Sequence, residues 1–142
     1  MHRHGPITLR AIDNDNNKLF EYLVPFSLGI TARQVMEQAF VQEQTPSNPD
    51  PFLFALEYYG YSDMAGYPGY LGYEIASIKD LPNNAEYYWD LLLNDIAATT
   101  GADTTFPNPG STVTWRYTAI AAGPAPLSKR AAIVKKRHGA PA

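Results

Sequence analysis

The sequence has no cysteine among its 142 residues, and its three histidines, His2, His4 and His138, all lie near the ends of the chain. The lack of cysteine excludes disulfides, thiolate metal sites and cysteine nucleophiles, and it leaves the redox compartment open. The lack of histidine between His4 and His138 removes the usual general base and the usual partner of a serine nucleophile. These absences argue against acid–base and nucleophilic catalysis.

Familiar catalytic and membrane signatures are missing as well. The sequence contains no G-x-S-x-G elbow, no Walker loop, no G-x-G-x-x-G turn and no H-E-x-x-H pair. It has no run of about 18 apolar residues of the kind that crosses a bilayer. We therefore expect a protein that is not an enzyme, has no transmembrane segment and needs no cofactor.

Length and charge predict one domain with a tail of opposite sign. A chain of 142 residues with 45% hydrophobic and 18% charged residues suits one compact core, which we place at residues 6–122, after a short arm at 1–5. Fourteen acidic and six basic residues precede Ser128, a net charge of −8, whereas the rest carries +5. The candidate partner-binding residues of the tail, 123–142, are Lys129, Arg130, Lys135, Lys136 and Arg137.

Such a basic tail has several uses. It can fold back on its own acidic body, contact a neighbouring copy or touch a polyanion. A solvated tail that only keeps the protein soluble is the simplest interpretation of the segment taken alone.

Alternating apolar residues at 7–11 and 20–26 predict a β-hairpin near the N-terminus. Its turn contains Asp13, Asp15 and Asn17, which place oxygen side chains at every other position, as calcium loops do. The turn lacks the glycine at the sixth position and the glutamate at the twelfth that complete an EF-hand. The three residues are weak metal candidates, and a plain Asp/Asn turn is the favoured interpretation.

A helix is predicted over residues 31–44, because Thr31 and Gln34 have the spacing of a capping box and Ile30 and Val35 that of a hydrophobic staple. The apolar stripe of this helix consists of Val35, Met36, Ala39 and Phe40. Strands are predicted at 52–59, 71–78, 87–93 and 112–120. One helix among strands indicates an α+β domain in which a mixed or antiparallel sheet carries the helix on one face.

The most unusual stretch is residues 58–78, which hold six of the ten tyrosines and four of the ten glycines. Tyrosine offers a large ring with a polar tip, and neighbouring glycines leave the ring faces open. This composition favours a surface that receives something flat. The alternative is that half of the rings pack on the sheet and the glycines only serve turns.

The second half of the chain resembles the transcobalamin-like C-terminal domain family, in an ordered match from Gly72 to Tyr117. That family has a G-Y-x-I-x-S-I strand, then W-x-x-x-x-N-G, then G-A-D, then G-D-x-V-x-W-R-Y. The residues here are Gly72, Tyr73, Ile75, Ser77 and Ile78; Trp89 and Asn94; Gly101, Ala102 and Asp103; and Gly110, Val113, Trp115, Arg116 and Tyr117. The departures are Asp95 for the usual glycine, Ser111 for the usual aspartate, and the tyrosine-rich stretch.

The resemblance implies a β-grasp-like fold, with a helix clasped by a mixed sheet, and a non-catalytic binding role. It also implies an extracellular or cell-surface location if a leader has been removed; a cytoplasmic or virion-associated location is the alternative. Cobalamin enters only through this resemblance, and in vitamin-B12 carriers that site also uses a helical-barrel domain that these 142 residues do not contain. Trp115 and Tyr117 are expected to be core or sheet-face residues of the last strand, with Trp115 mostly buried.

Two functions compete. The first is a binding module whose Tyr/Gly-rich loop at 61–70 and adjoining sheet edge hold a small ligand, a glycan or a protein surface. The second is a structural or assembly subunit of a larger extracellular or viral complex, in which the rings form an interface and the basic arm contacts a neighbour. The candidate binding residues are Tyr59, Tyr61, Tyr67, Tyr70, Tyr73, Tyr87, Tyr88 and Trp89.

Overall fold

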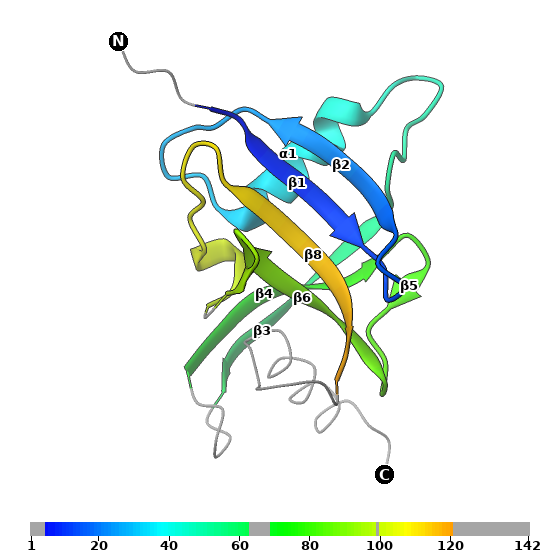
Figure 1. The fold of residues 1–142 in the computed structure, drawn as a ribbon, viewed down its shortest axis with the longest axis vertical. Coiled ribbons are helices and arrows are strands. Elements are labelled where there is room, and N and C mark those ends of the chain that lie inside the picture. The colour runs from blue at the N-terminus through cyan, green and yellow to red at the C-terminus, as the bar shows by residue number, and fades with distance from the viewer. Residues whose placement is uncertain (1–4, 63–68, 99, 121–142) are drawn as a thin grey trace.

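A computed structural model describes residues 5–62, 69–98 and 100–120 (Figure 1). This part of the chain combines strands with one α-helix and one short 3-10 helix, so the predicted α+β class is confirmed. In chain order the elements are β1 (Ile7–Ile12), β2 (Lys18–Val24), α1 (Ala32–Glu43), β3 (Phe54–Ser62), β4 (Gly69–Ile78), β5 (Leu81–Pro82), β6 (Tyr87–Leu93), β7 (Ile96–Ala97), η1 (Ala102–Thr104) and β8 (Thr112–Ala119).

The strands form two sheets. The larger has the order β2-β1-β8-β6-β7, in which β1 and β8 run parallel at the centre and the other neighbours are antiparallel. The smaller has the order β3-β4-β5, and its two long strands make a ribbon that projects from the larger sheet (Figure 1). The strands predicted at 52–59 and 71–78 therefore pair with each other in a sheet of their own.

The helix begins and ends where its capping residues require. The Thr31 hydroxyl accepts a hydrogen bond from the Gln34 N–H, and the Gln34 side chain accepts one from the Thr31 N–H, which completes the predicted capping box. Val35, Met36 and Ala39 are fully buried. Phe40 is half-buried and packs edge-on against Phe52 at 5.5 Å between ring centroids.

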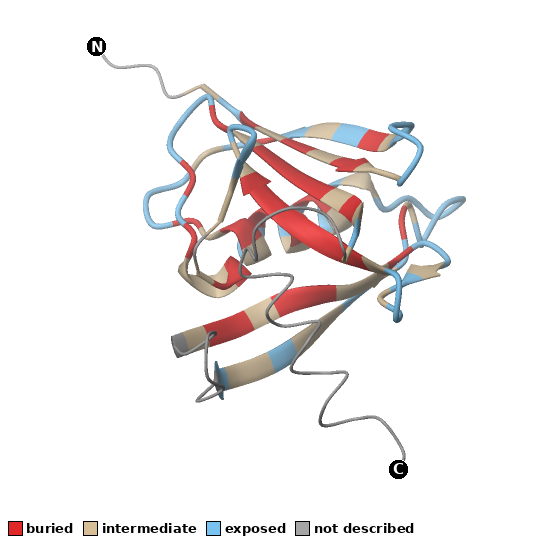
Figure 2. Cartoon of the chain, turned by 60° about the horizontal axis from the view of Figure 1, so that its bottom comes forward, coloured by how far each residue is buried: buried red, intermediate tan, exposed pale blue. Residues whose placement is uncertain are grey.

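The core lies between the larger sheet and α1 (Figure 2). Pairs of facing residues on β8 and β6, Trp115 with Leu91 and Tyr117 with Trp89, point into it and are all buried. The predicted burial of Trp115 is confirmed, and Tyr117 is a core residue. No helix in the described part of the chain is long and apolar enough to span a membrane.

Candidate functional site

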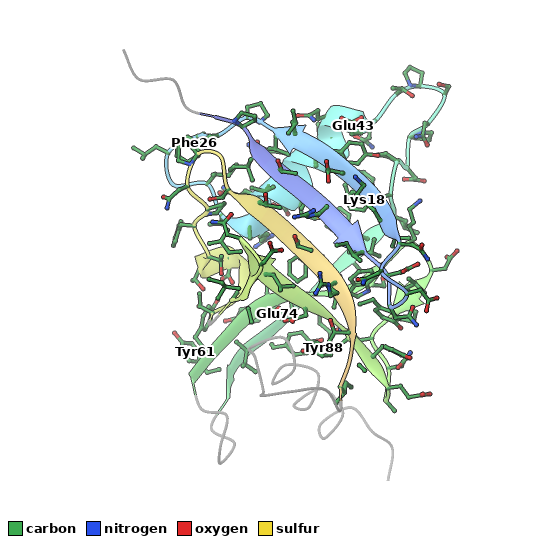
Figure 3. The ribbon with its side chains drawn as sticks, in the orientation of Figure 1. Lys18, Phe26, Glu43, Tyr61, Glu74 and Tyr88 are labelled. Atoms are coloured by element: carbon green, nitrogen blue, oxygen red, sulfur yellow. The ribbon has the colours of Figure 1, made fainter. Side chains whose placement is uncertain are left out.

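Four tyrosines lie on one face of the β3–β4 ribbon, and we call them the tyrosine platform: Tyr58, Tyr61, Tyr70 and Tyr73. The register places Tyr61 opposite Tyr70 and Tyr58 opposite Tyr73, with ring centroids 4.8 and 4.9 Å apart. Tyr58 and Tyr70 join the two pairs at 6.4 Å. Tyr61 is 78% exposed at the outer end of the ribbon and Tyr58 is 54% exposed (Figure 3).

The predicted loop at 61–70 is shorter than the sequence suggested. β3 continues through Ser62 and β4 begins at Gly69, so Tyr61 and Tyr70 belong to strands. Cross-strand contact between aromatic rings stabilises such a ribbon, which explains the extension. The platform is therefore built on a paired scaffold, which holds side chains more firmly than a loop does.

Asp103, on η1, fixes the position of the platform. Its carboxylate accepts a hydrogen bond of 2.6 Å from the Tyr70 hydroxyl and one of 3.1 Å from the Tyr73 backbone N–H. The hydrogen bond to Asp103, followed by desolvation, raises the pKa of Tyr70 well above its usual value, because ionisation would place two negative groups side by side.

Glycine permits this close approach of η1 to the ribbon. Gly72 has φ +62°, and a Cβ there would collide with the Asp103 carboxylate and lie 2.8 Å from the ring of Tyr70. A Cβ on Gly101 would lie 2.7 Å from the carbonyl oxygen of Leu71. Both distances are shorter than side chains tolerate, so Gly72 and Gly101 both have to be glycine for η1 to pack this closely against the ribbon.

Arg33 of α1 ends the row of rings. Its guanidinium carbon lies 4.1 Å from the centroid of the Tyr73 ring, a cation–π contact, while its Nε donates to the Glu37 carboxylate at 3.3 Å. A cation over a ring of this kind contributes about 0.5–1 kcal/mol at an exposed site. The platform thus combines apolar ring faces, phenol hydroxyls and one positive end.

The comparisons with known proteins can be set against this geometry. Residues 29–119 match the family described as "Domain of unknown function (DUF4430)". The chain belongs to the DUF4430 family. The match includes the helix, the ribbon and the Asp103 support. No curated protein matches the DUF4430 chain.

Several solved structures match this DUF4430 chain. One of them is a candidate metal-binding protein from Ruminococcus gnavus, with a TM-score of 0.54 and 16% sequence identity, and the match covers 81% of this chain and 97% of the other. At that identity the likeness shows the fold alone. Within residues 5–62, 69–98 and 100–120, no group of three or more histidine, aspartate or glutamate side chains could hold a metal ion.

The expected site at the start of β6 is placed differently from the prediction. Trp89 is buried in the core and donates from Nε1 to the Leu81 carbonyl oxygen at 2.7 Å, and Tyr88 is also buried. Tyr87 is half-buried and stacks on Tyr117 at 5.2 Å. β6 lies between β8 and β7 in the DUF4430 fold, and the burial of Tyr88 and Trp89 leaves neither ring exposed to a ligand.

Two further predicted residues lie elsewhere. Tyr59 follows Tyr58 on β3, so its side chain points to the face opposite the platform. It is half-buried, and its pKa is raised by desolvation and then by the negative charge of Glu57. Tyr67 falls outside the described residues, as do the five basic residues of the tail. Of the eight candidate binding residues, the platform contains Tyr61, Tyr70 and Tyr73.

The weak metal candidates form a hydrogen-bonded turn. One oxygen of Asp13 accepts from the backbone N–H groups of Asp15 and Asn17, at 2.9 and 2.8 Å, and Asn16 has φ +66°. The hydrogen bond from Asn17 lowers the pKa of Asp13. The Asp13 carboxylate is thus used to close the turn, as the favoured interpretation of this run requires.

Three residues of the site were not among the predicted ones: Tyr58, Arg33 and Asp103. Tyr58 and Tyr61 are three residues apart and still share one face, because the pairing of the ribbon is irregular between them, which no alternation in the sequence reveals. The contact of Arg33 with Tyr73 depends on tertiary packing. The G-A-D segment, with Gly101 and Asp103, was recognised as part of a family pattern. The pattern did not indicate that Asp103 would bind the tyrosines.

Proposed function

We propose that this DUF4430 chain is a non-catalytic binding module with a β-grasp-like fold, and that the tyrosine platform is its binding face. The fold proposal is supported by an N-terminal hairpin, a following helix, and a last strand that runs parallel to β1 at the centre of the sheet. The proposed kinship with transcobalamin-like domains is supported by Gly72, Gly101 and Asp103, which interlock in space as well as matching in sequence.

The observation that carries the binding role is the ring contact among the four tyrosines, of which Tyr58 and Tyr61 are more than half exposed. Exposed aromatic clusters of this kind are uncommon on surfaces that bind nothing. Tyrosine binds partners at low entropic cost, because its ring has only two rotatable bonds. Among the described residues, the carboxylate that contacts this row is that of Asp103, and both of its oxygens are engaged. A neutral ligand fits this chemistry.

The spacing favours a proline-rich peptide. The two ring pairs are separated by three residues on each strand, at most about 10 Å for a fully extended chain and less here, because both segments contain a glycine with positive φ. A polyproline II helix repeats about every 9 Å and docks on aromatic rings. One proline can therefore rest on each pair, with Arg33 beside the end of the peptide. A neutral oligosaccharide is the other ligand class to include in the test.

The test is a titration of the ¹⁵N-labelled protein with a proline-rich decapeptide and, separately, with a neutral hexasaccharide. We expect amide shifts in β3 and β4 and at Asp103, with the peptide as the stronger ligand. If only the hexasaccharide causes shifts, the ligand class is a neutral oligosaccharide and not a proline-rich peptide. The absence of shifts from these residues with both ligands would contradict the binding role.

A second function, assembly, is favoured by one other surface. Leu23, Pro25 and Val41 border two adjoining hollows where the end of β2 meets α1, and Leu23 and Val41 are 59% and 68% exposed. Exposed apolar residues gathered around hollows are typical of protein interfaces. If this surface joins copies, Val41→Glu lowers the mass measured in solution by light scattering. An unchanged mass excludes it.

A further inference from the structure

Arg33 lies at one end of the tyrosine platform, and most of its hydrogen-bonding capacity is unused. A guanidinium group carries five N–H donors. The Nε of Arg33 donates to the Glu37 carboxylate at 3.3 Å, and its guanidinium carbon lies 4.1 Å from the centroid of the Tyr73 ring. Its two terminal amino groups have no hydrogen-bond partner within residues 5–62, 69–98 and 100–120, and the side chain is 34% exposed. Four donors are therefore available to a ligand.

The unused donors suit a carboxylate. The contact with Tyr73 uses the face of the guanidinium, and the bond to Glu37 uses one donor at its edge. The two amino groups form a planar fork that matches the two oxygens of a carboxylate. Arg33 is also the second residue of α1, whose first turn contains no acidic residue, so the positive end of the helix dipole adds to its charge.

The carboxylates of Glu37 and Asp103 limit the strength of this attraction. Glu37 is paired with the Arg33 Nε, and Asp103 accepts hydrogen bonds from Tyr70 and Tyr73. Their negative charges oppose the approach of a third carboxylate. The gain therefore comes from direct contact with the free fork and is of the modest size typical of an exposed ion pair.

One short segment holds Arg33 and the rings in fixed relative positions. Asp103 accepts from the Tyr73 N–H, and the carbonyl oxygen of Thr105, two residues later, accepts from the Ala32 N–H at 2.9 Å. The same stretch of chain thus positions the ribbon and the start of the helix that carries Arg33. Little freedom is lost when a ligand contacts both, because the two are already arranged.

The rings alone do not fix the position of a proline-rich peptide. A polyproline II helix repeats every three residues and has no internal hydrogen bonds, so it offers a similar apolar surface at each turn. Stacking on the ring pairs therefore allows the peptide to slide by a whole turn. A charge at one end of the row removes this freedom, because only one register brings an acidic side chain to Arg33.

We infer that Arg33 is a specificity-determining residue of the tyrosine platform, and that it binds an acidic side chain that flanks the proline-rich core of the ligand. The rings bind the neutral core, and the guanidinium binds the carboxylate and fixes the register. This inference rests on the function proposed for the platform and adds a charged group at a defined end of its ligand.

The test compares three peptides with blocked termini by calorimetry at low ionic strength. They are a neutral proline-rich decapeptide and two versions of it, with a glutamate at the amino end or at the carboxyl end. We expect one of the acidic peptides to bind about three- to fivefold more tightly than the neutral one. Several hundred millimolar salt should reduce this preference, because it screens charge pairs.

Two results with the wild type would overturn the inference. Affinities of both acidic peptides within about twofold of the neutral one would show that no carboxylate is recognised. An equal gain for a glutamate at either end would show attraction without a fixed register.

Variants assign the preference to Arg33. The measured quantity is the affinity for the favoured acidic peptide divided by that for the neutral peptide, so a general effect of a substitution cancels. Arg33→Gln should bring this ratio to about one, and Arg33→Lys should give an intermediate ratio, because lysine keeps the charge without the fork. Arg10→Gln, which removes a charge from β1 in the larger sheet, should keep the wild-type ratio. A wild-type ratio in Arg33→Gln overturns the inference.

The results also separate this inference from the function on which it rests. If the neutral peptide binds the platform and only the preference is missing, the binding role stands and Arg33 loses its role. If only the neutral hexasaccharide binds, the binding role again stands and the inference falls. If neither peptide nor sugar binds, both fail.

Discussion

At the scale of one residue, the burial of Asp90 makes the stability of this fold depend on pH. Burial raises its pKa from 3.8 to about 6, and the nearby charge of Arg116 opposes the rise only in part. Between about pH 4 and pH 6 the folded state holds a proton that the unfolded state has lost, so the contribution of this group to stability is full below pH 4 and falls as the pH rises. Its contribution disappears as the pH rises through 6.

The prediction concerns the wild type relative to Asp90→Asn. Between pH 4 and pH 7.5, the free energy of unfolding of the wild type should fall by up to about 3 kcal/mol more than that of the variant, the equivalent of about two pKa units. Arg116, Glu74 and Tyr88 face Asp90 in both proteins, so their effects largely cancel. Urea denaturation at each pH measures the difference, and parallel curves would contradict the raised pKa. Asp80→Asn should follow the wild type.

Phe40 tests the packing of the helix at a second residue. It is half-buried and contacts Phe52 and Phe54. Phe40→Ala should lower the free energy of unfolding by about 2–3 kcal/mol, less than the roughly 4 kcal/mol expected for the fully buried Phe52. Denaturant unfolding of both variants gives the order, and an equal or reversed order would place Phe40 deeper in the core than the structure does.

At the scale of elements, the ribbon depends on its contact with η1. Gly72→Ala should cost about 3 kcal/mol or more, because a positive φ and a collision with Asp103 act together. Gly29→Ala is the matched control, since Gly29 has φ +80° and nothing within 4 Å of an added Cβ. It should cost about 1–2 kcal/mol from backbone strain alone. Thermal unfolding compares the two, and equal losses would show that the collision is relieved elsewhere.

The elements also show how far the sequence could predict the fold. The helix was predictable because its signals are local: a capping box at Thr31 and an apolar stripe through Met36. The hairpin was predictable from alternation. The burial of Tyr88 and Trp89 was not, because it depends on what packs on the two faces of β6. The shared face of Tyr58 and Tyr61, three residues apart, follows from irregular pairing between them that leaves no trace in the pattern.

The same limit applies to the site. The concentration of tyrosine and glycine at 58–78 predicted an aromatic surface and named three of its four rings. It did not predict that Asp103, 33 residues after Tyr70, would accept a hydrogen bond from the Tyr70 hydroxyl. Contacts of this kind depend on the path of the chain between two elements, which the sequence pattern does not predict.

At the scale of the whole molecule, different surfaces have different roles. The larger sheet and α1 bury the core, and the ribbon projects from them (Figure 2). Tyr58 and Tyr61 on the ribbon are exposed. The apolar hollows near Leu23 and Val41 lie on other elements, β2 and α1. A change on one surface should therefore leave the other surface's binding intact, because distant sites act additively.

The central claim is that the tyrosine platform is the binding face, and the most direct test measures affinity in two matched double variants. The proline-rich decapeptide is titrated by calorimetry into the wild type, into Tyr58→Ala/Tyr61→Ala and into Leu23→Ala/Val41→Ala. All four residues are exposed, so each variant should keep its stability within about 1 kcal/mol. We expect the tyrosine variant to bind at least about tenfold more weakly, since each lost aromatic contact costs about 1 kcal/mol. The Leu23/Val41 variant should bind as the wild type does. Equal affinity of the tyrosine variant and the wild type would contradict the account.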